Sequence, residues 1–141
     1  MPRLLVLAAL LFAIPALPAA AQARVDQLTI IDERVGEGHM ALEGMHASVT
    51  YAGWLYDPTQ PDQKGRQFDA SLDPENPFVM MIGSRRLIRG WNEGMIGMRI
   101  GGKRRLLLPP EDAYGAQGAP PAIPPYASLV FEIELHDLEQ R

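Results

Sequence analysis

The chain of 141 residues contains no cysteine. Disulfide bridges, thiolate zinc sites, cysteine nucleophiles and a lipidated N-terminal cysteine are therefore all excluded. If the protein works in an oxidising compartment, its stability has to come from a packed hydrophobic core rather than from disulfides.

Positive charge is also in short supply. Lys and Arg number 13 against 17 Asp and Glu, so the net charge is −4 with neutral histidines. This balance argues against non-specific nucleic-acid binding, and no nucleic-acid partner is expected. The composition, 47% hydrophobic and 21% charged, is typical of a globular protein, and the length suits one domain.

The N-terminus has an apolar run too short to cross a membrane. Arg3 is followed by residues 4–14 without a polar side chain, and then by small residues that end in Ala21-Gln22-Ala23. A positive start, an apolar stretch and an A-x-A site are typical of a signal peptide. An uncleaved anchor would need roughly 20 apolar residues. We therefore expect residues 1–23 to be removed near Ala23, leaving a periplasmic or secreted protein without a stable membrane anchor.

Helical periodicity is confined to one stretch, Leu87 to Met95. Gly90 and Gly94 lie four residues apart on one face, and each weakens the helix by ~1 kcal/mol relative to Ala. The simplest reason to tolerate both is a close approach of that face to a sheet. Thirteen Gly and thirteen Pro argue against a bundle of long helices.

Most of the remaining order is predicted to be β-structure. Alternating or β-branched patterns predict strands at 26–33, 49–54, from 68 onward, 77–82, 103–108 and 129–136. Long loops are expected at 56–67 and 111–126 because of their Pro and Gly content. The predicted fold is α+β: an antiparallel sheet of five to six strands with one short helix on one face. We expect residues 24–43 to form an N-terminal strand and turn, and residues 44–139 to form the main domain.

Familiar catalytic patterns are weak or missing. Residues 97–103 match the start of a phosphate-binding loop, but Arg104 follows where Ser or Thr is needed, and the segment runs from helix to strand. The three histidines lack the spacing of a helical metal pair, and no serine lies in a G-x-S-x-G elbow. No cofactor and no metal are expected. The carboxylate pairs Glu132/Glu134 and Glu111/Asp112 are interpreted as solvated, as are the basic residues of 85–89 and 103–105.

Six of the ten aromatic residues are spread over strands, helix and loop edges: Tyr51, Phe68, Phe78, Trp91, Tyr114 and Phe131. Scattered aromatics usually fill a core. Trp91, however, lies between two helix glycines, and Tyr114 lies in a Pro-rich loop, which is a poor place for a core residue. An aromatic-lined concave site is therefore a plausible alternative.

Seven short motifs in this order resemble the FKBP-type peptidyl-prolyl cis-trans isomerases. They are Val49-Thr50-Tyr51-Ala52-Gly53, Phe68-Asp69-Ala70-Ser71, Pro77-Phe78, Leu87-Ile88-Arg89-Gly90-Trp91 with Glu93-Gly94-Met95, Ala113-Tyr114-Gly115, Ile123-Pro124-Pro125 and Leu129-Val130-Phe131-Glu132-Ile133-Glu134-Leu135. The resemblance covers residues 44–138. It implies a bent antiparallel sheet wrapped around one short helix, with the site between helix and sheet.

The resemblance also assigns roles to individual residues. It implies a catalytic group of Tyr51, Phe68, Asp69, Tyr114 and Phe131. It implies a substrate-binding group of Phe78, Leu87, Ile88, Trp91 and Ile123. Trp91 would form the floor beneath the substrate proline ring. The Ile88 backbone N–H and the Tyr114 hydroxyl would hold substrate carbonyls.

The sequence departs from the family pattern in several places. The 56–67 loop is longer than in the minimal domain, and Leu87 replaces a common Val. The other departures are at Pro74, Ala119 and Ala122. Pro74 stands where many members carry an Arg that pairs with the pocket Asp. We expect Tyr51 to donate to Asp69, and Arg66 or another nearby Arg to supply the charge. The alternative is that Asp69 only begins a turn with Ser71. Ala119 and Ala122 occupy the flap where larger side chains are common, so the flap should grip less firmly.

The resemblance implies an isomerase, and the signal-like N-terminus points to proline-containing unfolded or nascent exported proteins as its substrates. The lack of a dimerisation helix favours a monomer. The resemblance also implies binding of macrolide inhibitors. The competing hypothesis is a non-catalytic chaperone or peptide-binding module that uses the same apolar groove.

Overall fold

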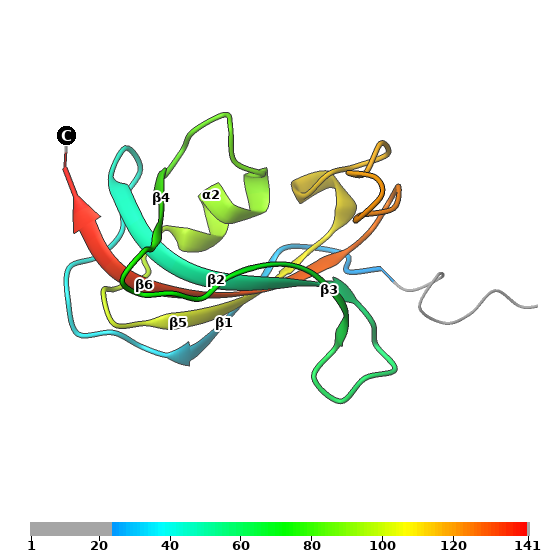
Figure 1. Ribbon diagram of the computed structural model, residues 1–141, viewed down its shortest axis with the longest axis horizontal. Coiled ribbons are helices and arrows are strands. Elements are labelled where there is room, and N and C mark those ends of the chain that lie inside the picture. The colour runs from blue at the N-terminus through cyan, green and yellow to red at the C-terminus, as the bar shows by residue number, and fades with distance from the viewer. Residues whose placement is uncertain (1–23, 141) are drawn as a thin grey trace, which may run out of the picture.

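The computed structural model describes residues 24–140, which form an antiparallel sheet with one short helix against one face (Figure 1). The predicted signal peptide, residues 1–23, lies outside the described residues. The elements in chain order are β1 (Thr29–Arg34), β2 (His46–Tyr56), β3 (Lys64–Ser71), β4 (Phe78–Met81), α2 (Arg89–Met95), β5 (Lys103–Leu108), the 3-10 turn η1 (Pro110–Asp112) and β6 (Leu129–Glu139). The predicted α+β class is confirmed.

The sheet is organised around β2 and β6. The strand order is β1-β5-β6-β2-β3, and every pairing is antiparallel. Because β6 pairs along one edge of β2, strands β3 and β4 share its other edge. β4 lies opposite residues 46–49 and β3 lies opposite residues 51–56. Register shifts in the β2 pairings with β3 and β6 allow the sheet to bend around the helix.

Strand β6 shows why this sheet has two different faces. Its alternate apolar residues Phe131, Ile133 and Leu135 are buried beneath α2, as the alternation predicts. Val130, on the opposite face, is also buried, because Val25 and Leu107 pack against it. The outer face is therefore not wholly wet, contrary to expectation.

Two element boundaries differ from the prediction. Strand β3 begins at Lys64, so the last four residues of the predicted 56–67 loop belong to a strand that pairs with β2. Helix α2 begins at Arg89, two residues later than predicted. Ile88 is extended, with φ −62° and ψ 146°, and occupies the N-cap position. This leaves its side chain and backbone free to face the space between helix and sheet.

The glycines of α2 allow it to lie directly on β5. A Cβ atom at Gly90 would stand 2.3 Å from Leu108 Cδ2, and one at Gly94 would stand 2.6 Å from Leu106 Cδ1. The predicted close approach is thus confirmed. Arg104 fixes the other end of the helix by donating to the carbonyls of Gly94, at 2.9 Å, and Ile96, at 2.8 Å.

Ion pairs cover much of the outer face. Glu132 pairs with Lys64 and Lys103, and Glu134 pairs with Arg34. Burial alone would raise the pKa of Glu132, but the hydrogen bond and charge of Lys64 and the charge of Lys103 outweigh it and lower that pKa. The interpretation of these two carboxylates as merely solvated is wrong: both are paired.

Candidate functional site

A cavity of about 210 Å³ lies between α2 and the concave face of the sheet, and we call it the Trp91 cavity. Its lining is largely aromatic and comes from six separate segments of the chain. The lining residues are Tyr51, Phe68, Asp69, Phe78, Arg86, Leu87, Ile88, Trp91, Tyr114 and Phe131. Nine of the ten predicted site residues therefore meet around one cavity. Arg86 was not predicted.

Each segment reaches the cavity for a simple geometric reason. Tyr51 in β2 and Phe131 in β6 point to the helix side because side chains alternate along a strand. Trp91 projects from the first turn of α2. Phe78 begins β4, and Tyr114 follows η1. The segment 110–126, yellow to orange in Figure 1, lies at the right-hand end of the sheet. The fold, not any local motif, brings them together.

Trp91 forms the floor of the cavity. Its side chain is only 4% exposed, and three rings meet it edge to face. The centroid distances are 4.9 Å to Tyr51, 5.4 Å to Phe131 and 6.1 Å to Phe78. Its indole nitrogen is buried and has no hydrogen-bond partner within residues 24–140. Edge-to-face contacts of this kind stabilise and orient rings beyond simple area burial.

Gly53 makes room for the side walls. It lies on β2 between Asp69 of β3 and Phe131 of β6. A Cβ atom here would stand 2.7 Å from both Phe131 Cε1 and Phe68 Cζ. Because Gly53 has no Cβ atom, the rings of Phe68 and Phe131 can meet edge to face, with their centroids 5.5 Å apart. The sequence contained Gly53 within a family motif, but its role in shaping the cavity was not predicted.

Asp69 is held by a tyrosine rather than by an arginine. The Tyr51 hydroxyl donates to Asp69 Oδ2 at 2.7 Å, as expected. No basic side chain of residues 24–140 forms an ion pair with Asp69. The expectation that Arg66 supplies the charge is wrong, because its guanidinium donates to the Ala122 carbonyl at 2.5 Å. Asp69 lies inside β3, so the turn alternative with Ser71 is also wrong.

Two hydrogen-bond donors of the lining are unused within the described part of the chain. The Ile88 backbone N–H has no acceptor there, and its carbonyl is engaged by the N–H groups of Trp91 and Asn92. The Tyr114 hydroxyl has no partner there either, and the side chain is 40% exposed. An apolar floor with two free donors beside it can hold a ring and two carbonyl groups.

Comparison with known proteins agrees with this geometry. The family model described as FKBP-type peptidyl-prolyl cis-trans isomerase matches residues 38–136. The chain belongs to this family. Members of the family are peptidyl-prolyl cis-trans isomerases, so the predicted enzyme class is confirmed.

The similar proteins come from several lineages. The FK506-binding protein of Neisseria meningitidis serogroup A is 44% identical over 108 residues, which are 77% of this chain and 93% of that protein. The mouse peptidyl-prolyl cis-trans isomerase FKBP2 is 46% identical over 64% of this chain and 60% of its own length. A crystal structure of a peptidyl-prolyl cis-trans isomerase from Pseudomonas syringae superimposes with a TM-score of 0.67 at 34% identity, covering 83% of this chain and 79% of that one.

One predicted site residue of this FKBP-type chain lies elsewhere. Ile123 is 3% exposed and packs in the core instead of lining the Trp91 cavity. Paired backbone hydrogen bonds with Ala119 close the flap turn that holds it.

The missed residue, Arg86, directly precedes Leu87 and Ile88, which line the same cavity. That adjacency was the only signal in the sequence that could have revealed it.

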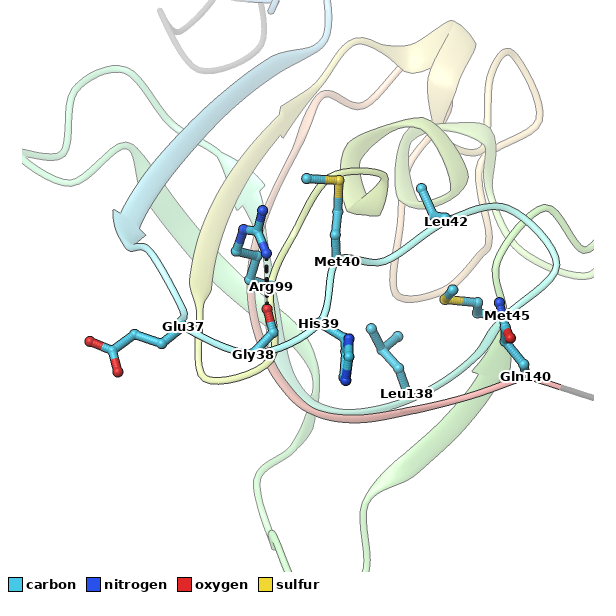
Figure 2. A pocket seen from close by; sticks show the side chains of 9 residues that line it. All are labelled: Glu37, Gly38, His39, Met40, Leu42, Met45, Arg99, Leu138 and Gln140. Atoms are coloured by element: carbon cyan, nitrogen blue, oxygen red, sulfur yellow. Dashed lines mark hydrogen bonds between the residues drawn. The ribbon is translucent and has the colours of Figure 1, made fainter.

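Another cavity is larger than the Trp91 cavity. A space of about 770 Å³ lies where residues 37–45 pass the end of β6 (Figure 2). There Arg99 donates to the Gly38 carbonyl at 3.1 Å. None of the nine residues that line it within 24–140 is Phe, Tyr or Trp.

In the described part of the chain, no group of His, Asp and Glu could hold a metal ion, and no helix could span a membrane.

The two cavity tyrosines should keep this FKBP-type site active into the alkaline range. Burial, followed by the hydrogen bond and charge of Asp69, raises the pKa of Tyr51; burial and then the charge of Asp69 raise the pKa of Tyr114. We therefore expect kcat/KM to stay level up to about pH 10, the ordinary tyrosine pKa. Above that pH the unfolded chain loses protons that the folded chain keeps, so the free energy of unfolding should fall as pH rises.

Two measurements from about pH 7 to about pH 11 check these expectations. NMR exchange between the cis and trans forms of a proline peptide gives kcat/KM, and urea unfolding gives the free energy of unfolding. A loss of kcat/KM below about pH 9 in a protein that is still folded would contradict the assignment of protonated tyrosines.

Proposed function

We propose that the Trp91 cavity catalyses cis-trans isomerisation of Xaa-Pro bonds in proteins that fold after export. The observation that carries the proposal is an apolar, ring-lined space of about 210 Å³ beside two unused donors, the Ile88 N–H and the Tyr114 hydroxyl. A proline ring would rest on Trp91, and the donors would hold the flanking carbonyls.

Rotation about a peptide bond faces a barrier of ~18–20 kcal/mol because resonance is lost at the twisted state. No bond breaks, so neither a nucleophile nor an electron transfer is required. The planar amide is more dipolar than the twisted one. Transfer from water to the rings around Trp91 therefore destabilises the planar form more, which lowers the barrier. Donors that fit the twisted rotamer add differential binding.

Clients outside the cytoplasm are supported by the leader-like residues 1–23, with Ala21-Gln22-Ala23 at their end. Uncatalysed Xaa-Pro isomerisation takes ~10–100 s at 25 °C and can limit refolding after translocation. We expect intact-mass measurement of protein recovered from the periplasm to show a chain that begins near Arg24. A full-length chain that begins at Met1 and stays in the inner membrane would contradict export.

A holding chaperone that uses the same groove is the second candidate, since an apolar cavity also binds unfolded chains. The two functions differ in stoichiometry. An isomerase present at about one hundredth of the substrate concentration should accelerate proline-limited refolding, because it turns over. A holder should slow refolding and should need equimolar amounts. The chain beginning at Arg24 should show the first behaviour.

A further inference from the structure

A second cavity continues directly from the Trp91 cavity. It has a volume of about 600 Å³ and shares three lining residues with it: Phe78, Arg86 and Leu87. Its other lining residues are His46, Val79, Met80, Met81 and Ser84. We call this space the β4 groove. A polypeptide whose proline lies on Trp91 can pass over Phe78 and Leu87 into the groove without leaving the surface.

The β4 groove combines apolar side chains with an unpaired strand edge. Val79 is 57% exposed and Met81, two residues further along the strand, is 41% exposed, so two apolar side chains of β4 are left open to solvent. Within the described residues, β4 pairs only with β2, so its other edge has no strand beside it (Figure 1). An extended chain can add to such an edge through main-chain hydrogen bonds, which tolerate many sequences.

The groove also carries free positive charge. Arg86 lines it, Arg85 stands next to Arg86, and both are exposed. Neither guanidinium forms an ion pair with any of residues 24–140. By contrast, Arg89, Arg104 and Arg105 are all paired with carboxylates. An acidic residue of a bound chain would therefore meet an unneutralised partner at Arg86.

We infer that the β4 groove binds the stretch of unfolded chain that adjoins the substrate proline, and that it prefers an apolar residue together with an acidic one. The inference rests on the proposed isomerase function and extends it from one proline to a longer segment. The groove thereby makes Arg86 a specificity-determining residue shared by the two cavities.

The test compares three peptides by NMR exchange between cis and trans forms. One is a short peptide centred on Ala-Pro, the second adds Leu and Asp on both sides of that core, and the third replaces each Asp by Lys. For the unmodified protein, kcat/KM should be about fivefold higher for the Leu/Asp peptide than for the short one, near the upper limit for an exposed ion pair. The Lys peptide should gain less.

Variants then locate the effect. Val79→Ser should turn over the short peptide normally but lose most of the gain from extension. The matched control is Val35→Ser, since Val35 is 69% exposed and lines neither cavity. Arg86→Glu should reverse the preference between Asp and Lys peptides. Equal kcat/KM for short and extended peptides, or an unchanged gain in Val79→Ser, would overturn the inference while leaving the isomerase intact. Failure to turn over even the short peptide would instead contradict the proposed function.

Discussion

Replacing Gly53 by alanine is expected to abolish most isomerase activity, with a loss of kcat/KM of more than tenfold. The new methyl group would stand 2.7 Å from ring atoms of Phe68 and Phe131, well inside van der Waals contact. The rings must turn or separate, and either movement alters the walls of a cavity of only about 210 Å³. Overpacking of this kind also lowers the free energy of unfolding by about 1–3 kcal/mol.

The matched control is Gly94→Ala, which places a methyl group 2.6 Å from Leu106 Cδ1, beneath the helix. Leu106 does not line the Trp91 cavity. The overpacking in this variant is partly offset by the higher helix propensity of Ala, worth ~1 kcal/mol, and kcat/KM per folded molecule should be kept. If Gly53→Ala is overpacked and remains as active as Gly94→Ala, the side walls do not shape the site as described.

Replacing Asp69 by alanine should lower kcat/KM about tenfold while the free energy of unfolding changes by less than about 0.5 kcal/mol. The carboxylate accepts the Tyr51 hydroxyl at 2.7 Å and holds that ring over Trp91. A tenfold loss corresponds to about 1.4 kcal/mol of transition-state stabilisation, which displacement of the Tyr51 ring from its place beside Trp91 would account for. Because Tyr51 borders an open cavity, water can replace the lost acceptor, so the fold should survive.

Kinetics and urea unfolding of the same Asp69→Ala preparation make this test decisive. Asp137→Ala is a suitable comparison, since Asp137 is an exposed carboxylate of β6 that does not line the cavity. It should leave both quantities unchanged. Unchanged turnover in Asp69→Ala would remove Asp69 from the site while leaving the aromatic cavity in place.

The parts of the structure that could be predicted depend on local pattern. Alternation along 129–136 revealed β6, and Gly90 and Gly94 at helical spacing revealed the close approach of α2 to β5. The family motifs then predicted nine of the ten residues that line the Trp91 cavity. Strand β6 and the helix contact depend on periods of two or four residues, which a single chain displays directly. The cavity residues were predicted only through the resemblance to the family.

The features that escaped prediction depend on which distant segments become neighbours. Glu132 of β6 meets Lys103 because β5 is the neighbouring strand, and it meets Lys64 because β3 follows β2 on its other side in the sheet. Arg104 reaches the end of α2 only because β5 runs beneath it. In the same way, the flap carbonyl of Ala122 lies within reach of Arg66, so the guanidinium expected at Asp69 is engaged elsewhere. The charge and spacing of residues along the sequence do not reveal which distant side chains come into contact.

The central claim is that isomerisation takes place on Trp91, and a macrolide titration tests it most directly. The variant Trp54→Phe leaves Trp91 as the single tryptophan, because the chain has only two. Trp54 lies outside the cavity, with the Lys64 ammonium 4.3 Å from its ring centroid. A macrolide with a pipecolyl-type ring should then quench Trp91 fluorescence and inhibit turnover with one shared midpoint. The macrolide concentration at that midpoint should be higher than in relatives whose flap carries larger side chains than Ala119 and Ala122. Turnover that persists after Trp91 is fully quenched would contradict the account.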